Sequence, residues 1–172
     1  GQDLEAIVRE LDLLSGQAIF STTKLEPDHL ARVYNAVDCT INISDAEGFG
    51  LATLESLACG TPIIVNMTGG LQEQVTDSKN WFGIGIKPAS SAIIGSQQVP
   101  YIYEDYVSAE TVAEALYKMY NMGTEERESL GQKARDYVLS EFAYQDTIDK
   151  WNDTMVDLIE NWKYENYSVE TL

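Results

Sequence analysis

Residues 37–66, which read VDCTINISDAEGFGLATLESLACGTPIIVN, carry the pattern that decides the fold. The apolar run at 37–43 predicts a buried strand, and residues 44–50 form a polar loop that contains two glycines. Residues 51–58 have helical spacing and precede a glycine and a proline, which commonly end helices. A second apolar run at 63–66 predicts another strand. Strands that alternate with helices and read as continuous apolar runs are typical of a parallel sheet covered on both faces, so we expect an α/β domain.

The flanking sequence extends this alternation in both directions. Before the central stretch, helical spacing at 4–14, an apolar run at 17–21 and a segment opened by proline at 27–36 predict a helix, a strand and a helix. After it, we expect a short helix at 71–75 and a strand at 81–87.

The second half of the chain changes character. Residues 88–105 are rich in serine, glycine and proline and predict a long irregular loop, of a kind that is usually functional or mobile. Everything after this loop has helical spacing. The expected helices cover about 109–121, 125–141 and 144–163, and Thr124 is the expected N-cap of the second one.

The composition excludes several kinds of partner. The 172 residues carry 11 Lys and Arg against 28 Asp and Glu, which gives a net charge of −17. Nucleic acids and anionic membrane surfaces need clustered basic side chains, so neither is expected as a partner. Two cysteines are too few for a disulfide scaffold, and we find neither a membrane-spanning apolar run nor a signal peptide. A cytoplasmic protein with reduced cysteines fits these features.

The glycine-containing loop and the helix after it suit an anionic ligand. The first N–H groups of a helix have no partner within the helix, and the helix dipole adds positive potential at the same end. Gly48 and Gly50 would allow a ligand to approach the backbone closely. An anion could therefore bind here without any lysine, although the chain as a whole is acidic.

Two carboxylates bracket this loop. Glu47 precedes the helix, and Glu55 lies about 7 Å along the helix axis from Gly50. Because carboxylates accept hydrogen bonds from hydroxyl groups, a diphosphate at the helix start would have one carboxylate beside each group attached to it. Two hydroxyl-rich groups joined by a diphosphate describe a nucleotide sugar, with Glu47 at the sugar and Glu55 at the ribose. The spacing alone also fits two solvated glutamates without any such role.

These residues, taken in their order, resemble a known family. The segments are Tyr34-Asn35-Ala36-Val37-Asp38, Ser44, Glu47-Gly48-Phe49-Gly50-Leu51, Leu54 to Pro62, Gly69-Gly70 and Glu73. Together they resemble the C-terminal domain of retaining GT-B glycosyltransferases, most closely glycosyltransferase family 4, whose signature has two glutamates with seven residues between them. The resemblance implies a Rossmann-like parallel sheet flanked by helices, lacking its first strands, with a helical C-terminal segment. It divides the chain into a nucleotide-sugar-binding domain at 1–143 and a C-terminal helix and tail at 144–172.

The resemblance also assigns roles around a nucleotide-sugar donor. Glu47, the predicted catalytic residue, would contact the hydroxyls of the sugar, and Glu55 would bind those of the ribose. The backbone N–H groups of Leu51 and Ala52 would bind the diphosphate. The sugar and the distal phosphate would be lined by Gly48, Phe49 and Gly50, and the base-binding edge would contain Ser21, Thr22 and Lys24.

The mechanism that the resemblance implies needs no cofactor. Family members retain the anomeric configuration through a same-face attack, in which the leaving phosphate oxygen helps to take the acceptor's proton. Catalysis would then depend on positioning and on stabilising charge on the leaving diphosphate. No metal is expected, and Asp45-Ala46-Glu47 resembles a metal-binding Asp-x-Asp motif only loosely. GDP-mannose is the favoured donor, UDP-hexoses such as UDP-glucose stay open, and the acceptor would be a glycan or another hydroxyl compound.

The resemblance implies, finally, that parts of the enzyme lie outside this sequence. A GT-B enzyme has two Rossmann-like domains, and 172 residues hold only one of them. The Arg and Lys that grip the diphosphate and the N-terminal acceptor domain are not found, so we expect the isolated chain to be inactive or nearly so. The last helix would cross to that N-terminal domain with part of its apolar face, which includes Trp151 and Trp162. A nucleotide-sugar epimerase, a phosphorylase-type enzyme and a non-catalytic nucleotide-binding fragment remain as alternatives.

Overall fold

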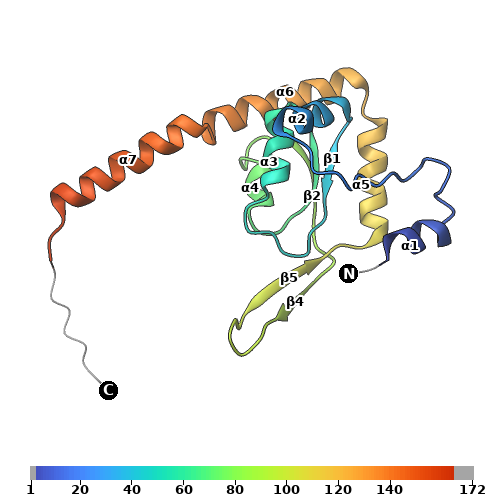
Figure 1. Cartoon of the computed structure of the whole chain (residues 1–172), viewed down its shortest axis with the longest axis horizontal. Helices are drawn as coiled ribbons and strands as arrows, with labels where there is room; N and C mark the ends of the chain where they lie inside the picture. Colours follow the sequence, from blue (N-terminus) through green and yellow to red (C-terminus); the bar gives the residue numbers. More distant parts are fainter. Residues whose placement is uncertain (1–2, 165–172) are drawn as a thin grey trace. The chain divides into compact units, whose positions relative to one another are not determined.

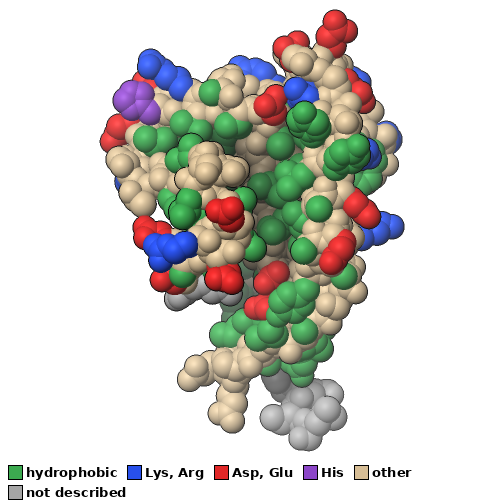
Figure 2. Space-filling model, turned by 90° about the vertical axis from the view of Figure 1, so that its right-hand side faces the viewer, with side chains coloured by type: hydrophobic (Ala, Val, Ile, Leu, Met, Phe, Trp, Pro, Cys, Tyr) green, Lys and Arg blue, Asp and Glu red, His purple; other side chains and the backbone are tan. Residues whose placement is uncertain are grey.

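The structure, a computed structural model, describes residues 3–164 (Figure 1). The chain divides after Leu30 into two compact units, and each is described by itself. None of the helices within the described residues has both the length and the apolarity needed to cross a bilayer. On the face drawn in Figure 2, acidic side chains are scattered among basic and hydrophobic ones.

The first unit contains helix α1, Leu4–Glu10. Asp3 caps it, because its side chain accepts a hydrogen bond from the Ala6 N–H at 3.0 Å. The helix is shorter than the predicted 4–14, since Asp12 adopts a positive φ of 54° and turns the chain. The predicted strand at 17–21 is wrong: these residues form turns and irregular structure, and no described residue of this unit pairs with them. A strand needs a neighbour to satisfy its backbone groups.

The second unit is built on a parallel sheet with the order β1-β2-β3. The strands are Thr40–Asn42, Ile63–Asn66 and Gly83–Ile86. The central strand β2 is buried at every position, which explains its continuous apolar sequence. The outer strands are shorter than the predicted 37–43 and 81–87, because only their middle residues pair with β2.

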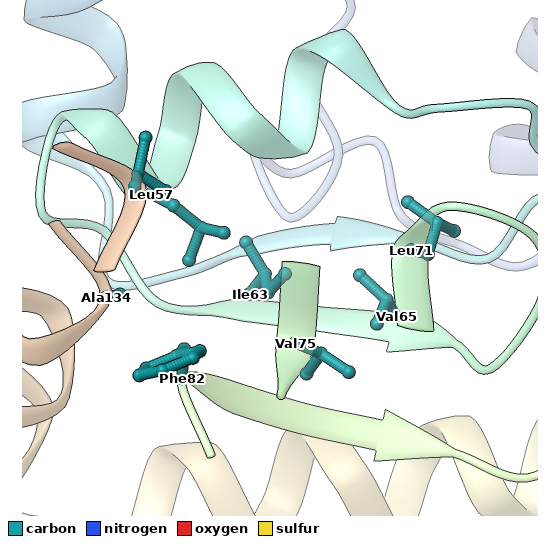
Figure 3. Close-up of a cluster of buried hydrophobic side chains, with 8 residues drawn as sticks. Leu57, Ile63, Val65, Leu71, Val75, Phe82 and Ala134 are labelled. Atoms are coloured by element: carbon teal, nitrogen blue, oxygen red, sulfur yellow. The ribbon is translucent and has the colours of Figure 1, made fainter. Parts of the chain in front are cut away.

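Helices cover both faces of this sheet, as predicted for an α/β fold. They are α3 (Leu51–Ala58), α4 (Leu71–Val75), α5 (Ala109–Asn121) and α6 (Thr124–Glu141). Helix α2, Pro27–Ala36, spans the boundary between the two units and has no buried residue. Ile63 and Val65 join a core cluster with side chains of α3, α4 and α6, while Ile64 between them packs with side chains of α5. Figure 3 shows the first cluster, in which Leu57 of α3 points toward Ile63 of β2. The alternation along one strand therefore places α5 on the face opposite to α3 and α4.

The segment at 88–105 differs from the irregular loop that its sequence predicts. It forms an antiparallel hairpin of β4 (Ser90–Ile94) and β5 (Ile102–Tyr106), in which Ala92 is opposite Glu104. Figure 1 shows the hairpin projecting from the sheet. Most of its residues are exposed, so the strands lack the alternation of apolar and polar residues that identifies a half-buried strand.

The C-terminal helices follow the prediction closely. Helix α6 starts at Thr124 with Gly123 as its N-cap, so the predicted cap at Thr124 is wrong by one residue. Helix α7, Tyr144–Asn161, continues from α6 and has no buried residue within the described part of the chain. Its apolar side chains are exposed, as in Trp151 at 65% and Ile159 at 78%. Residues 165–172 of the predicted tail lie outside the described residues.

Candidate functional site

The loop after β1 enters α3 through a glycine that no other residue can replace without strain. Gly50 is the N-cap of α3 and has φ 90° and ψ 60°, in the left-handed region. A Cβ added there would lie 2.6 Å from Leu71 Cδ2 and 2.8 Å from Thr53 Oγ1. Gly50 is therefore required by the fold. Gly48 has no atom within 4 Å of such a Cβ, so the fold leaves open space beside it.

The first turn of α3 presents free backbone donors. The Leu54 N–H donates to the Gly50 carbonyl at 3.1 Å and closes the first helical turn. Within the described residues, the N–H groups of Leu51 and Ala52 donate to no protein acceptor, and both residues are exposed. An anion bound at this turn would meet two unpaired donors and the positive end of the helix dipole.

A buried glutamine on α4 makes hydrogen bonds to the backbone of the loop before α3. Gln74 is fully buried, and its Nε2 donates to the carbonyl oxygens of Phe49 at 2.6 Å and Gly50 at 3.1 Å. The Thr53 hydroxyl lies 2.5 Å from Gln74 Oε1 and 2.8 Å from the Gly50 carbonyl, so its single proton serves one or the other. Sequence reasoning missed Gln74, because a polar residue on a short helix gives no sign of burial.

We expect Gln74→Leu to destabilise the fold by about 2 kcal/mol, because it removes the buried donor that Phe49 and Gly50 share. Thermal unfolding should show a Tm lower by roughly 4–8 °C. The matched control is Gln72→Leu on the same helix, where the side chain is exposed and its hydrogen bond to Gly69 is 3.4 Å long. Equal Tm values for the two variants would contradict the bracing role of Gln74.

Glu47 is fixed by the close packing of its backbone against two glycines. The Gly70 N–H lies 3.4 Å from the Glu47 carbonyl oxygen and 3.2 Å from that of Gly48. A Cβ on Gly69 would lie 1.7 Å from the Glu47 oxygen, and one on Gly70 would lie 2.8 Å from Phe49 Cα. The Glu47 side chain is half-buried, and its Oε2 lies 3.5 Å from Asn42 Nδ2. Its position is thus set by the loop after β2 as well as by its own loop.

Glu55 lies on the exposed side of α3, one helical turn beyond the free donors. Its Oε2 accepts a hydrogen bond from the hydroxyl of Tyr34 on α2 at 3.2 Å. Burial raises the pKa of Tyr34 to about 12, and the carboxylate of Glu55 adds to the shift. Tyr34 belongs to the motif quoted from the sequence, but sequence reasoning gave it no role.

The hairpin is anchored to the same loop. Asn66, at the carboxyl end of β2, donates from Nδ2 to the carbonyls of Ser44 at 3.0 Å and Asp105 at 2.6 Å. The Asp105 N–H donates to the Asp45 carbonyl at 2.7 Å. Asn66 Oδ1 is buried and has no partner within residues 3–164. A shift of the hairpin would therefore be transmitted to the loop that carries Glu47.

Phe49 connects the loop to the end of α6. Its ring is 42% exposed and packs edge-on against Phe142, at a centroid distance of 5.9 Å. Phe142 is the residue at which α6 ends. The aromatic contact was not foreseen from the sequence.

The remaining predicted residues lie in the first unit. Ser21, Thr22 and Lys24 are exposed in the irregular segment between α1 and α2. The predicted residues from Glu47 to Glu55 all lie in the second unit, on one loop and the first turns of α3. No group of three or more His, Cys, Asp or Glu side chains in the described part of the chain has a metal-binding arrangement.

A further cavity of the second unit lies away from the start of α3. It measures about 800 Å³ and lies between α4, the segment after it and α6. Its lining includes Glu73, Asp77, Asp136 and Glu141 against a single basic residue, Lys133. This lining repels an anion, whereas the start of α3 offers unpaired backbone N–H groups and the positive end of a helix dipole, so it is the better candidate for a phosphate ligand.

Comparison with known proteins gives a match over most of the chain. The family model described as glycosyl transferases group 1 matches residues 3–137. The D-inositol 3-phosphate glycosyltransferase of Acidothermus cellulolyticus is 41% identical over 69 residues, which are 40% of this chain and 15% of the relative. The enzyme of the same name from Mycolicibacterium gilvum is 48% identical over 50 residues, 29% of this chain and 11% of the relative. The matches thus span a small part of these relatives' own length.

Three solved structures share the fold. Sucrose-phosphate synthase from Thermosynechococcus elongatus has a TM-score of 0.69 at 24% identity, with 91% of this chain and 34% of that chain covered. HepE from Anabaena, in complex with UDP and glucose, has a TM-score of 0.70 at 17% identity, with 90% and 36% covered. The C-terminal domain of the group 1 glycosyl transferase LpcC from Francisella tularensis has a TM-score of 0.60 at 23% identity, with 82% and 61% covered.

Proposed function

Because the chain belongs to the glycosyl transferases group 1 family, we propose that it is the donor-binding part of a retaining, family 4-like glycosyltransferase. It would take part in transferring a hexose, mannose being favoured, from a nucleotide sugar to a glycan or another hydroxyl acceptor. The names of the relatives support transfer to a hydroxyl compound, and the UDP and glucose bound to HepE support a nucleotide-sugar donor. The acceptor domain and the basic diphosphate clamp would be supplied by sequence outside these 172 residues.

One observation carries this proposal. The two free N–H groups at Leu51 and Ala52 lie between a carboxylate before the helix and a carboxylate one turn further along it. The donors suit a diphosphate, and the carboxylates Glu47 and Glu55 suit hydroxyl groups on either side of it. A carboxylate, two backbone N–H groups and a second carboxylate thus follow one another in the order that a sugar, a diphosphate and a ribose would require.

The arrangement also explains how so acidic a chain would bind an anion. The net charge of −17 gives unfavourable long-range electrostatics for a diphosphate. Backbone N–H groups act at hydrogen-bond distance, where their direction matters more than the distant, screened charges. Binding would therefore be local and weak in the isolated chain, and stronger once basic residues from elsewhere contribute.

In the proposed reaction, the protein stabilises charge and supplies no covalent nucleophile. As the bond between the sugar and the diphosphate breaks, negative charge grows on the leaving phosphate oxygen. The first turn of α3 faces that charge with donors that are already oriented, which lowers the barrier without reorganisation. Glu47 would hold the sugar by its hydroxyls, and the leaving phosphate oxygen would help to take the acceptor's proton from the same face. No metal or cofactor is part of the proposal.

The domain assignment is part of the same proposal. Residues 1–143 would form the nucleotide-sugar-binding domain, with Ser21, Thr22 and Lys24 near the base. The segment at 144–172 would reach the acceptor domain, and the exposed apolar side chains of α7 support this. We propose a cytoplasmic location for the enzyme.

Protein-observed NMR titration, which detects weak binding, and a turnover assay test this function. The isolated chain is expected to bind GDP-mannose or a UDP-hexose and to transfer little or no sugar to a glycan acceptor. Failure to bind any of these donors would contradict the proposal. Epimerisation of the sugar of an intact donor in the absence of an acceptor would indicate an epimerase instead, and robust transfer by the isolated chain would contradict its expected inactivity.

A further inference from the structure

Glu55 has an unusual environment for a residue with a proposed binding role. It is exposed, and its three side-chain torsions would leave the carboxylate free to sample many positions. Within the described part of the chain, its hydrogen-bond partner is the Tyr34 hydroxyl, 3.2 Å from Oε2. A bond to one carboxylate oxygen restricts the side chain and leaves the other oxygen available.

Tyr34 is itself held in place relative to α3. Its side chain is half-buried on α2, and its carbonyl oxygen accepts a hydrogen bond from Thr61 Oγ1 at 2.6 Å. Thr61 is 4% exposed and follows the end of α3. The backbone of Tyr34 is thus tied to the segment after α3, while its hydroxyl contacts the helix itself.

The hydroxyl of Tyr34 also stays protonated at physiological pH. Burial, and then the negative charge of Glu55, raise its pKa to about 12. Both causes oppose ionisation, so the group remains a donor until the solution is strongly alkaline. The Tyr34 hydroxyl is therefore available as a donor to Glu55 at all lower pH values.

We propose that Tyr34 is a positioning residue that orients Glu55 for the hydroxyls of the donor's ribose. The inference rests on the proposed function, because it assumes that Glu55 binds the ribose. Tyr34 itself does not touch the donor. It acts by fixing Oε2 so that Oε1 is presented to the ligand in one orientation.

The test compares ribonucleotides with their 2′,3′-dideoxy forms. Affinities of GDP and UDP, each with its dideoxy counterpart, would be measured by protein-observed NMR titration, which reaches millimolar dissociation constants. We expect Tyr34→Phe to weaken ribonucleotide binding about 3- to 10-fold, the size of the net effect of one ordinary hydrogen bond, and to leave dideoxynucleotide binding unchanged. The preference for ribose should therefore fall toward that of Glu55→Gln. The double variant should bind no more weakly than Glu55→Gln alone, since the two residues act as a unit.

Tyr137→Phe is the matched control. It also removes a tyrosine hydroxyl, which donates to the carbonyl of Glu73 at 2.8 Å on another side of the unit. It should leave the ribose preference unchanged, and both Phe variants should keep the fold because the ring is retained.

The outcomes separate this inference from the function on which it rests. An unchanged ribose preference in Tyr34→Phe, with a lost preference in Glu55→Gln, would overturn the role of Tyr34 and keep the proposed function. Additive losses in the double variant would likewise overturn it. If the unmodified chain binds neither GDP nor UDP, or binds without preferring ribose, the assignment of Glu55 fails and the inference fails with it.

Discussion

Replacing Gly69 with alanine is expected to destabilise the second unit by about 3 kcal/mol or more and to abolish donor binding. The new Cβ would lie 1.7 Å from the Glu47 carbonyl oxygen, far inside van der Waals contact. That oxygen belongs to the backbone, so the clash cannot be relieved by a rotamer change. Gly69 also has a φ of 46°, where a side chain adds strain. Either the loop that carries Glu47 or the loop after β2 must move, and each movement breaks the packing that sets the position of Glu47.

Gly48→Ala is the control for this prediction. It also replaces a glycine of the candidate site with alanine, but no atom lies within 4 Å of the new Cβ at position 48. Thermal unfolding should show a Tm lower by roughly 6–12 °C for Gly69→Ala and little change for Gly48→Ala. Similar Tm values for the two would mean that the two loops are not packed together as described.

Glu47→Gln is expected to weaken nucleotide-sugar binding about 10- to 100-fold while the nucleoside diphosphate alone binds almost as before. The carboxylate would accept hydrogen bonds from the sugar hydroxyls, and these bonds are absent when the sugar is absent. The sign of the effect is informative. Removing a negative charge near an anionic ligand should strengthen binding by Coulomb's law, so a loss of affinity would exclude a simple charge effect and favour lost hydrogen bonds.

Asp45→Asn provides the comparison for Glu47→Gln. It makes the same change of charge two residues earlier in the same loop, and its side chain is exposed. Protein-observed NMR titration should show equal or slightly tighter donor binding for Asp45→Asn. If Glu47→Gln also binds the donor as tightly as the unmodified chain, Glu47 does not contact the sugar.

The sequence predicted α3 and β2 well, because the local preference of their residues agrees with their burial in the folded chain. Helix α3 has apolar spacing, a glycine before it and a Gly-Thr-Pro sequence after it, and its observed bounds match the predicted ones. Strand β2 is apolar at its first three positions, since helices cover both faces of the sheet. In such a segment, the side chains that favour the helix or strand locally are the same side chains that are buried in the core.

The prediction failed where structure depends on a distant partner. The hairpin of β4 and β5 has exposed strands and a serine-rich start, so its pairing leaves no pattern in the sequence. The stretch at 17–21 is apolar but has no neighbouring strand in the described part of its unit. A short apolar run cannot by itself reveal whether a partner exists.

The candidate site was predictable as a motif but not as a set of tertiary contacts. Glu47, Gly50 and Glu55 stand out from their order along the chain. The residues that hold them, Gln74 and Tyr34, come from other elements, and only the folded chain brings them within hydrogen-bond distance. Ser21, Thr22 and Lys24 stay a prediction for the base-binding edge.

The most direct test of the proposed donor site maps a nucleotide onto the backbone. Adding GDP or UDP to the isotope-labelled chain should shift the amide resonances of Leu51 and Ala52 more than any others, because their N–H groups are the proposed donors to the diphosphate. The shifts should saturate with added nucleotide. Shifts centred instead on the acidic cavity around Asp77 and Lys133, or no saturable shifts at all, would contradict a donor site at the start of α3.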